Sequence, residues 1–435
     1  MNQLLKEGQI LPIDSKDNCV IEKLLGSGGQ GEVYQVALQS KSYALKWYYP
    51  IMATIEQKAG LENLIRSGAP NEKFLWPEFV LTNTANNTFG YIMPLRLAHY
   101  KGIIDLMKNR IKPSFKAIAR AGVYLANSFL KLHSKGLCYR DISFGNLFFD
   151  PATGDIQICD NDNVTTNGNP FVTVTGTPRF IAPEILRSEA FPSTSTDLFS
   201  LAVLLHYMLF VHHPLDGEQE DKIHSFDLPA MTKLYGKNPI YIYDPNNNTN
   251  RPVPGRHDNA IIYWNIYPSF IKQLFIRAFT DGLYPKGRVM EIEWRDNMAR
   301  LHDCMIYCQC GAENFHDAKE YEISRKTTVC WACKKPTSLP PRLKVNRHLI
   351  MLNADTVLYP FHVDPNMGCD YSNPIAKVNQ HPTNKNLWGL QNLSTNKWTI
   401  ITSGGLMSEV LPGKSISLNS SIKVNFGKTE GEIRI

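Results

Sequence analysis

The sequence predicts an α+β fold that is followed by a small cysteine-rich module and an all-β sandwich. Three observations lead to this prediction. Residues 10–50 read as strands on either side of a glycine-rich turn, and residues 114–135 place apolar side chains at helical spacing. From about residue 345 onward, short apolar runs alternate with turn residues, as in antiparallel sheets.

The bulk composition is that of an ordinary globular chain. Its 435 residues are enough for about two to four domains, and 43% hydrophobic residues allow a large core. The formal net charge of +6 is modest for this length, and blocks of like charge are missing. We therefore expect no nucleic-acid partner and no disordered basic arm.

Three features predict a cytoplasmic protein without a membrane partner. The first eight residues contain no apolar core of signal-peptide length. The longest apolar run, residues 198–211, is shorter than the about 20 apolar residues that span a bilayer, so it reads as a buried helix. Nine cysteines in a large chain without a leader indicate reduced thiols.

A glycine-rich turn contains Gly26, Ser27, Gly28 and Gly31 and ends at Val33. Glycine lets backbone amides approach phosphate groups because no Cβ stands in the way. Taken alone, the pattern fits a plain hairpin turn or a dinucleotide-binding loop about equally well. A dinucleotide-binding loop would open a helix, whereas the residues after Gly31 continue as a strand.

The following predicted strand carries Ala44 and Lys46, and the lysine lies thirteen residues after Val33. Most lysines on strands are simply exposed to solvent. The offset of Lys46 from the glycine-rich turn favours a contact with nucleotide phosphates instead.

A group of polar residues follows the long predicted helix. Asp141 precedes Asn146 by five residues, and Asp160 follows fourteen residues later, after a short β-like run. Phosphoryl transfer needs such groups, because one carboxylate orients the attacking hydroxyl while an amide and a second carboxylate hold magnesium. Such residues also form turns, and that reading suits Asp162 and Asn163. Turn formation explains the whole set poorly, because the spacing agrees with a phosphoryl-transfer site at three points.

These motifs resemble the protein kinase superfamily of the Ser/Thr type over about residues 20–300. The resemblance implies a bilobal fold, ATP and Mg²⁺ as cofactors, and a protein as substrate. The matching segments are Tyr139-Arg140-Asp141 with Asn146, Asp160-Asn161-Asp162, and Gly-Thr-Pro-Arg-Phe-Ile-Ala-Pro-Glu at residues 176–184.

The resemblance also implies a role for each residue. Asp141 would orient the substrate hydroxyl, and Lys46 would contact the α- and β-phosphates. A helix glutamate would hold Lys46; we prefer Glu62 to Glu56 for its apolar neighbours, although either could face solvent. The predicted nucleotide-binding residues are Gly26, Ser27, Gly28, Gly31, Val33, Ala44, Lys46, Glu62, Met93 and Leu95, with Asn146 and Asp160 as Mg²⁺ ligands.

Three departures from the family pattern bear on activity. Tyr139 replaces a histidine, Ser143 stands where a lysine usually assists transfer, and Asn161 replaces an apolar plug between the lobes. We expect altered regulation of the turn at Asn161, with Mg²⁺ binding by Asp160 kept. A pseudokinase scaffold is therefore an alternative. A small-molecule phosphotransferase is a second one, opposed by the peptide-receiving residues 176–184.

Residues 163–184 resemble an activation segment. A phosphate on this segment could pair with Arg140 and order it, although a threonine-rich loop that is never modified is an equally good reading. The candidate autophosphorylation sites are Thr165, Thr166, Thr173 and Thr175.

The resemblance also predicts two structural contacts and an insertion. Glu184 would pair with Arg288, and Asp197 would hold the catalytic-loop backbone or cap its own helix. Residues 212–262 are rich in Pro, Asn, Tyr and His and read as a packed insertion.

Four cysteines form two pairs, Cys308 with Cys310 and Cys330 with Cys333. Two such knuckles on neighbouring hairpins give four thiolates in a tetrahedron, which is the usual structural zinc site. The alternatives are free thiols or a redox pair. Because the first knuckle has only one intervening residue, substitute ligands remain open, namely Cys304, His302 and His316.

The C-terminal β region resembles forkhead-associated domains, but it lacks their Gly-Arg and Ser-x-x-His phosphothreonine patterns, so we favour a docking or structural role. With the cysteine-rich module, it resembles the kinase of a bacterial, tellurite-resistance-linked triad. That resemblance implies a metal-dependent protein phosphatase and a von Willebrand A protein as partners. The predicted parts are an N-lobe at 1–95, a C-lobe at 96–303, a zinc ribbon at 304–336 and a β-sandwich at 345–435.

Overall fold

The computed structural model describes residues 3–13, 18–83, 88–169, 176–402, 404–418 and 420–435, and these divide into two compact units. Three segments within residues 96–303 group with the C-terminal residues in this division. The first unit comprises Met1–Pro113, Tyr124–Asp258 and Ile276–Glu291, and the second comprises Ser114–Val123, Asn259–Phe275 and Ile292–Ile435.

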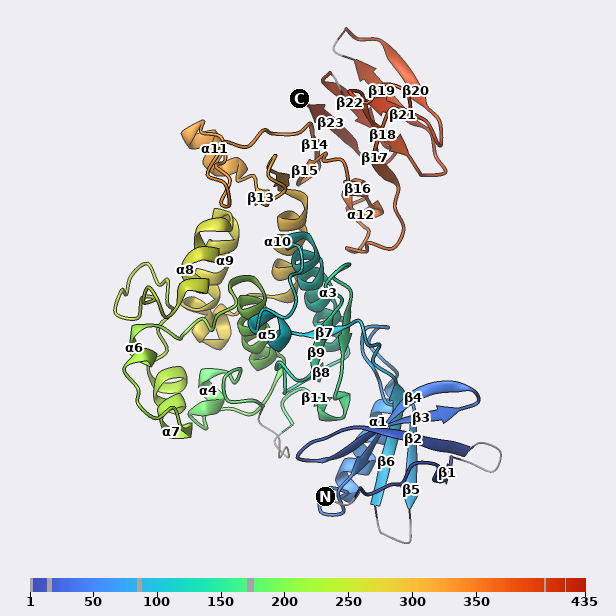
Figure 1. The fold of residues 1–435 in the computed structure, drawn as a ribbon, viewed down its shortest axis with the longest axis vertical. Coiled ribbons are helices and arrows are strands. Elements are labelled where there is room, and N and C mark those ends of the chain that lie inside the picture. Colours follow the sequence, from blue (N-terminus) through green and yellow to red (C-terminus); the bar gives the residue numbers. More distant parts are fainter. Residues whose placement is uncertain (1–2, 14–17, 84–87, 170–175, 403, 419) are drawn as a thin grey trace. The chain divides into compact units, whose positions relative to one another are not determined.

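The first unit begins with a six-stranded antiparallel sheet of order β1-β2-β3-β4-β6-β5 (Figure 1). Alternating buried positions on β3 and the mostly buried β6 place aromatic and branched side chains in two clusters around this sheet. The strands are β1 (Ile10–Pro12), β2 (Asn18–Ser27), β3 (Gly31–Leu38), β4 (Lys41–Tyr48), β5 (Phe79–Asn83) and β6 (Thr88–Pro94).

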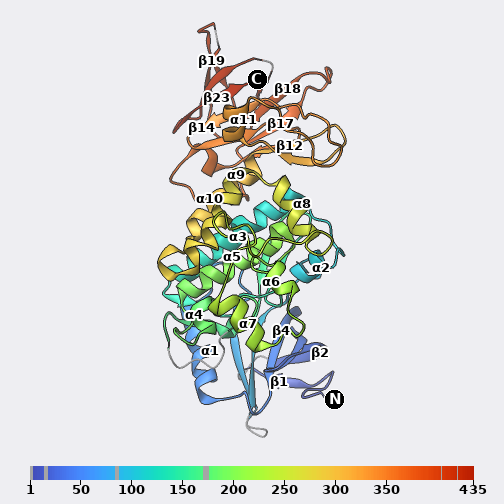
Figure 2. The same cartoon turned by 90° about the vertical axis from the view of Figure 1, so that its left-hand side faces the viewer.

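Helix α1 (Ile55–Ser67) lies against this sheet in both views (Figures 1 and 2). The Thr54 side chain accepts a hydrogen bond from the Gln57 backbone N–H at 3.2 Å and so caps the first turn. The helix ends at Gly68, whose φ of +66° lies in the left-handed region that glycine adopts readily.

The rest of the first unit is mainly helical. Helix α5 (Thr194–Phe210) is buried along almost its whole length, which explains its continuous apolar sequence. Ser193 and Thr196 form a reciprocal capping box at its start. Short strands lie before, within and after residues 139–162: β7 (Lys101–Gly102), β8 (Leu137–Cys138), β9 (Leu147–Phe149), β10 (Ile156–Ile158) and β11 (Thr165–Thr166).

The remaining helices are short apart from three. The predicted insertion packs through the buried side chains of Leu215, Leu234 and Tyr235. The helices are α2 (Ile103–Met107), α3 (Phe115–Ser134), α4 (Pro183–Leu186), α6 (Glu218–Asp221), α7 (Leu228–Met231), α8 (Asp258–Ile266), α9 (Ser269–Ala278), α10 (Glu291–Asp303), α11 (Ala318–Ser324) and α12 (Pro360–Val363).

The second unit contains a small hairpin and two larger antiparallel sheets. The sheets have the orders β15-β14-β23-β22-β19-β20 and β16-β17-β18-β21, and their inward side chains share one hydrophobic core. The strands are β12 (Met305–Tyr307), β13 (Glu313–Phe315), β14 (Arg342–Val345), β15 (His348–Met351), β16 (Val357–Leu358), β17 (Ala376–Gln380), β18 (Trp388–Asn392), β19 (Trp398–Thr402), β20 (Met407–Val410), β21 (Ser415–Ser417), β22 (Ile422–Asn425) and β23 (Glu430–Arg434).

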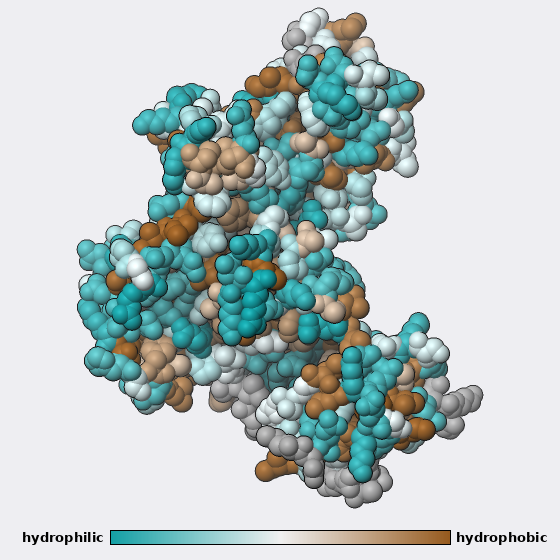
Figure 3. All heavy atoms as spheres, in the orientation of Figure 1, coloured by the Kyte–Doolittle hydropathy of each residue, from teal (hydrophilic) through white to brown (hydrophobic). Residues whose placement is uncertain are grey.

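The predicted mixture of helix and sheet, with a β region at the C-terminal end, is confirmed. The face drawn in Figure 3 is mostly hydrophilic, with hydrophobic side chains scattered over it. Among the residues that the structure describes, no helix combines the length and apolar character needed to cross a membrane.

Candidate active site

The glycine-rich turn joins β2 to β3 and is held by a hydrogen bond from the Gly28 N–H to the Gly31 carbonyl at 2.9 Å. A Cβ added at Gly26 or Gly28 would meet no atom within 4 Å, so this side of the turn is open. A Cβ at Gly31 would lie 2.1 Å from the Trp47 carbonyl oxygen, so only glycine fits there. The turn therefore packs closely against the neighbouring strand at Gly31 and is exposed from Gly26 to Gly28.

Four of the predicted nucleotide-binding residues belong to one hydrophobic cluster of the sheet. Ala44 and Met93 are buried, and Val33 and Leu95 pack against the same cluster with partial exposure. Ala44 and Met93 are also direct neighbours across β4 and β6. The structure therefore brings these predicted residues together on one side of the sheet.

Lys46 on β4 is buried, with 5% of its surface exposed. Its Nζ atom lies 2.9 and 3.1 Å from the two carboxylate oxygens of Asp162 and 2.8 Å from the Gln30 side-chain oxygen. The Asp160 carboxylate lies 3.6 Å away. Burial alone would lower the pKa of Lys46, but the two carboxylates outweigh it and raise that pKa.

Glu62 differs from its prediction. Glu62 and Glu56 are both exposed on α1, and the described partners of Lys46 do not include either of them. The buried positions of α1 are Leu61 and Leu64, so the helix turns Glu62 away from the sheet. From the same helix, Gln57 donates a hydrogen bond to the Tyr48 hydroxyl at 3.1 Å.

Asp141 and Asn146 form a second polar group. The Asn146 amide donates to the Asp141 carbonyl at 2.8 Å and to its carboxylate at 3.1 Å. The Thr177 hydroxyl donates to the other carboxylate oxygen at 2.8 Å. The Cys159 N–H donates to the Asn146 carbonyl at 2.8 Å, so this group adjoins the residue before Asp160.

The turn that carries Asp160 is fixed by polar contacts. Asp160 has a φ of +49°, in the left-handed region. The fully buried Asn161 donates its amide to the carbonyls of Leu75 at 2.8 Å and Ile158 at 3.0 Å. Two hydrogen bonds thus take the place of the apolar plug that we expected to be missing here.

Burial raises the pKa of the Asp160 carboxyl, the neighbouring Asp162 and Asp141 carboxylates add to this, and Lys46 opposes it. A divalent cation bound to Asp160 would offset this crowding of negative charge.

Asp197 anchors the backbone just before Asp141 to helix α5. Its carboxylate accepts the N–H of Tyr139 at 2.5 Å and the N–H of Arg140 at 2.9 Å. Arg140 has a φ of +72°, a backbone conformation that such anchoring stabilises. The Tyr139 hydroxyl donates to the Cys159 carbonyl, so this side chain joins the segment around Asp141 to the segment around Asp160.

His133 lies between two buried carboxylates, those of Asp197 and Glu291. Burial opposes protonation, but the hydrogen bonds to Asp197 and Glu291 raise the pKa of His133 to about 9. The folded-state pKa exceeds the ordinary value of 6.5, so protonated His133 stabilises the folded state. This contribution to stability is complete below about pH 6.5 and is lost as the pH rises through about 9.

We expect the unfolding free energy of the wild-type protein to fall by about 3 kcal/mol between pH 6.5 and pH 9.5 through this group. The variant His133→Gln should lose this pH dependence, whereas replacing the exposed His224 by Gln should keep it. Urea denaturation at several pH values measures the effect. A His133→Gln protein with the wild-type slope would contradict the assignment.

The activation segment is described only in part. Thr165 and Thr166 form β11, which pairs with β8, whereas Thr173 and Thr175 lie outside the described residues. The Arg140 guanidinium donates to the Asn163 carbonyl. Phosphorylation of this segment and its pairing with Arg140 therefore stay predictions.

Glu184 and Arg288 form the predicted buried ion pair. One guanidinium nitrogen of Arg288 lies 2.8 and 2.7 Å from the two carboxylate oxygens of Glu184. The guanidinium also lies 4.8 Å from the centre of the Phe199 ring. The ion pair connects helix α4, which contains Glu184, to the segment before α10.

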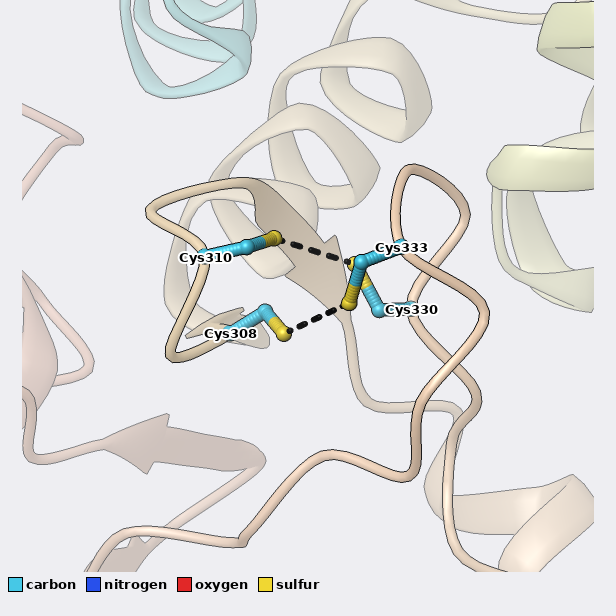
Figure 4. Close-up of side chains that lie close together, drawn as sticks. All are labelled: Cys308, Cys310, Cys330 and Cys333. Atoms are coloured by element: carbon cyan, nitrogen blue, oxygen red, sulfur yellow. Dashed lines mark hydrogen bonds between the residues drawn. The ribbon is translucent and has the colours of Figure 1, made fainter.

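The four cysteines of the second unit converge on one point (Figure 4). Their sulfur atoms all lie within 4.8 Å of one another, with Cys308 3.5 Å from Cys333 and Cys310 3.7 Å from Cys330. Tetrahedral zinc with bonds of about 2.3 Å would place sulfurs about 3.8 Å apart, so this donor set fits the ion. The substitute ligands Cys304, His302 and His316 are not part of the group.

Another feature around these cysteines favours a thiolate. Burial raises the pKa of Cys330, but the backbone N–H of Cys333 and the Asn314 amide outweigh it and lower that pKa to about 6. The Asn314 amide nitrogen lies 3.5 Å from the Cys330 sulfur. Such hydrogen bonds commonly orient and tune metal-binding sulfurs.

A cluster that sequence reasoning missed surrounds Asp303 at the end of α10. His348 and His362 lie 3.2 and 3.3 Å from its carboxylate. The ring Nδ1 of His362 accepts the Tyr359 N–H at 2.9 Å, so the ring proton is on Nε2, facing Asp303. A metal ligand would need that position unprotonated, so we interpret the cluster as a buried hydrogen-bonding centre. No local spacing signal joins these residues.

The family found by comparison with known proteins is consistent with the geometry of this site. The family model of the protein kinase domain matches residues 19–253, which are more than half of the chain. The chain therefore belongs to the protein kinase domain family. A protein kinase domain implies ATP and Mg²⁺ as cofactors.

Several curated relatives match the same part of the chain. Protein kinase C delta type of Mus musculus is 30% identical over 219 residues, covering 48% of this chain and 31% of that protein. Protein kinase C eta type of Homo sapiens is 30% identical over 235 residues, covering 50% and 33%. The probable cell cycle serine/threonine-protein kinase CDC5 homolog of Encephalitozoon cuniculi is 28% identical over 213 residues, covering 47% and 44%. The chain spans less than half the length of each of these proteins.

Proposed function

We propose that this chain is an ATP- and Mg²⁺-dependent Ser/Thr protein kinase that phosphorylates a partner protein and itself. The observation that carries the proposal is the linked pair of polar groups. Lys46 lies beside Asp160, Asn146 donates to Asp141, and a backbone hydrogen bond joins Asn146 to Cys159. A lysine, two carboxylates and an amide are the groups that phosphoryl transfer requires.

In this reaction each residue would position or neutralise charge. The exposed glycine-rich turn from Gly26 to Gly28 and the Lys46 ammonium would bind the triphosphate. Asn146 and Asp160 would hold Mg²⁺, which neutralises charge on the phosphate oxygens. Asp141, held in place by Thr177, would accept a hydrogen bond from the substrate hydroxyl and orient it toward the γ-phosphorus.

The proposal is tested by incubating the full chain with Mg²⁺, ATP labelled on the γ-phosphate and a generic basic protein. Label should appear on serine and threonine, on the added protein or on the chain itself, and EDTA should prevent it. Phosphoamino acid analysis distinguishes these residues from tyrosine. Protein that binds ATP tightly but transfers no label would instead support the pseudokinase scaffold, which the serine at position 143 favours.

We also propose that Cys308, Cys310, Cys330 and Cys333 hold a structural zinc ion in a zinc ribbon. The purified chain should contain about one zinc ion per molecule, and Cys330→Ser should lose it. Replacing the buried Cys369 by Ser is the matched control and should keep the metal. Elemental analysis after dialysis measures both, and a wild-type chain without zinc would contradict the assignment.

We further propose that the two C-terminal sheets form a forkhead-associated-like docking sandwich in a cytoplasmic bacterial protein. Their shared core supports a sandwich. A metal-dependent protein phosphatase and a von Willebrand A protein are the partners that the sequence resemblance implies. Phosphosite mapping after incubation of the chain with these two proteins would test the proposed partners. The absence of phosphorylation on both proteins would contradict that proposal.

A further inference from the structure

Asp162 is the most completely enclosed carboxylate beside the proposed nucleotide site. None of its side chain is exposed. Its two oxygens receive four hydrogen bonds: two from Lys46 at 2.9 and 3.1 Å, one from the Tyr48 hydroxyl at 2.5 Å and one from the Tyr91 hydroxyl at 3.0 Å. An ionised carboxylate has about four acceptor sites, so the set is complete.

The sheet explains why these donors converge. Lys46 and Tyr48 are two residues apart on β4, so their side chains leave the same face of the strand. Tyr91 on β6 is the direct cross-strand neighbour of Lys46 and therefore points to that face as well. Three donors from two adjacent strands thus meet one acceptor that the 160–162 turn supplies.

The helix does not supply this acceptor. Glu56 and Glu62 are exposed, and the contribution of α1 at this place is the neutral Gln57, which donates to Tyr48. Active protein kinases require an ion pair between the strand lysine and a helix glutamate. In this chain the carboxylate opposite the lysine comes from the turn instead.

We propose that Asp162 is the positioning residue of Lys46 and takes the part that a helix glutamate plays in the family. The inference rests on the proposed kinase function. The Lys46 Nζ atom lies within hydrogen-bonding distance of both Asp162 oxygens and of the Gln30 side-chain oxygen in the glycine-rich turn. A phosphate oxygen would replace Gln30, while Asp162 keeps the ammonium in place.

This arrangement has a consequence for regulation. In the family, a helix that swings away removes its glutamate and thereby switches the enzyme off. Here the lysine's partner sits on a turn that Asn161 fastens to the carbonyls of Leu75 and Ile158. Lys46 therefore stays oriented whatever the position of α1, and we expect activity that does not depend on this helix.

The test compares Asp162→Asn with Glu62→Gln and Glu56→Gln in the full chain. Asp162→Asn should lower kcat by about 100-fold or more, as removal of an electrostatic catalytic contact does. Glu62→Gln and Glu56→Gln should keep kcat within about threefold of wild type, as exposed substitutions do. Far-UV circular dichroism and thermal unfolding show that each variant is folded.

A double-mutant cycle separates positioning from a purely structural role. Affinity for a non-hydrolysable ATP analogue with Mg²⁺ is measured for Asp162→Asn, for Lys46→Met and for both together. If Asp162 acts through Lys46, the double variant should bind as weakly as Lys46→Met alone. A further loss of affinity in the double variant would show a structural role and overturn the inference.

The possible failures are distinguishable. An inactive wild-type protein would remove the proposed function, whereas an active wild type with an active Asp162→Asn and an inactive Glu62→Gln would remove only this inference. If Asp162→Asn does not fold, Tyr48→Phe combined with Tyr91→Phe keeps the carboxylate and removes two of its hydrogen bonds. That variant should lower kcat about tenfold, and an unchanged kcat would overturn the inference.

Discussion

Replacing Asp141 by Asn should slow phosphoryl transfer by about 10²- to 10⁴-fold, the range that a positioned base contributes. The substitution keeps the side-chain shape and one oxygen, so Thr177 can still donate to it. The carboxylate that would orient the substrate hydroxyl is lost. Single-turnover transfer of labelled γ-phosphate to a basic protein measures the rate.

Affinity for the ATP analogue should change little in the same variant, because Asp141 is proposed to contact the hydroxyl and not the phosphates. Calorimetric titration measures this affinity. Replacing Glu72 by Gln, whose side chain is 75% exposed, is the matched control and should leave both quantities unchanged. A rate that stays at the wild-type level in Asp141→Asn would exclude Asp141 from the reaction.

Arg288→Ala should lower the unfolding free energy by about 3–5 kcal/mol, because it leaves the Glu184 carboxylate buried without its partner. Both side chains of the pair are less than 10% exposed. Urea denaturation followed by circular dichroism measures the loss. Replacing both residues by methionine should recover much of it, since a well-packed apolar pair avoids the uncompensated charge.

The exposed pair of Lys222 and Glu218 provides the control. Their charged atoms lie 2.8 Å apart, one helical turn from each other, and their side chains are 67% and 47% exposed. Lys222→Ala should therefore change the unfolding free energy by less than about 1 kcal/mol. Equal losses in Arg288→Ala and Lys222→Ala would show that burial does not set the importance of the Glu184 pair.

The sequence predicted the parts of the site that depend on fixed spacing along the chain. The glycine-rich turn, Lys46, and the offset from Asp141 to Asn146 follow from local chain geometry, and the structure places Lys46 beside Asp160 and Asn146 beside Asp141. The two cysteine pairs could be predicted for the same reason, because each pair lies on one turn of the chain.

The partner of Lys46 could not be found in this way. Asp162 lies 116 residues from Lys46 along the chain, and as one residue in a polar turn it resembled a turn former. Its role depends on how the turn packs against the sheet, which no local spacing encodes.

The prediction of Glu62 relied on its apolar neighbours. These neighbours form the buried face of α1, and Glu62 is not part of that face. Leu61 and Leu64 are the buried residues of α1, and Gln57 precedes them by four and seven positions. Residues at these spacings share one helix face, so Gln57, and not Glu62, points toward the sheet.

The central claim is that Lys46, Asp141, Asn146 and Asp160 act on one triphosphate. A crystal structure of the chain with Mg²⁺ and a non-hydrolysable ATP analogue tests it most directly. We expect Lys46 within hydrogen-bonding distance of the α- or β-phosphate, Mg²⁺ bound by Asn146 and Asp160, and Asp141 facing the γ-phosphate. An analogue bound elsewhere, or one whose phosphates contact none of these four side chains, would contradict the account.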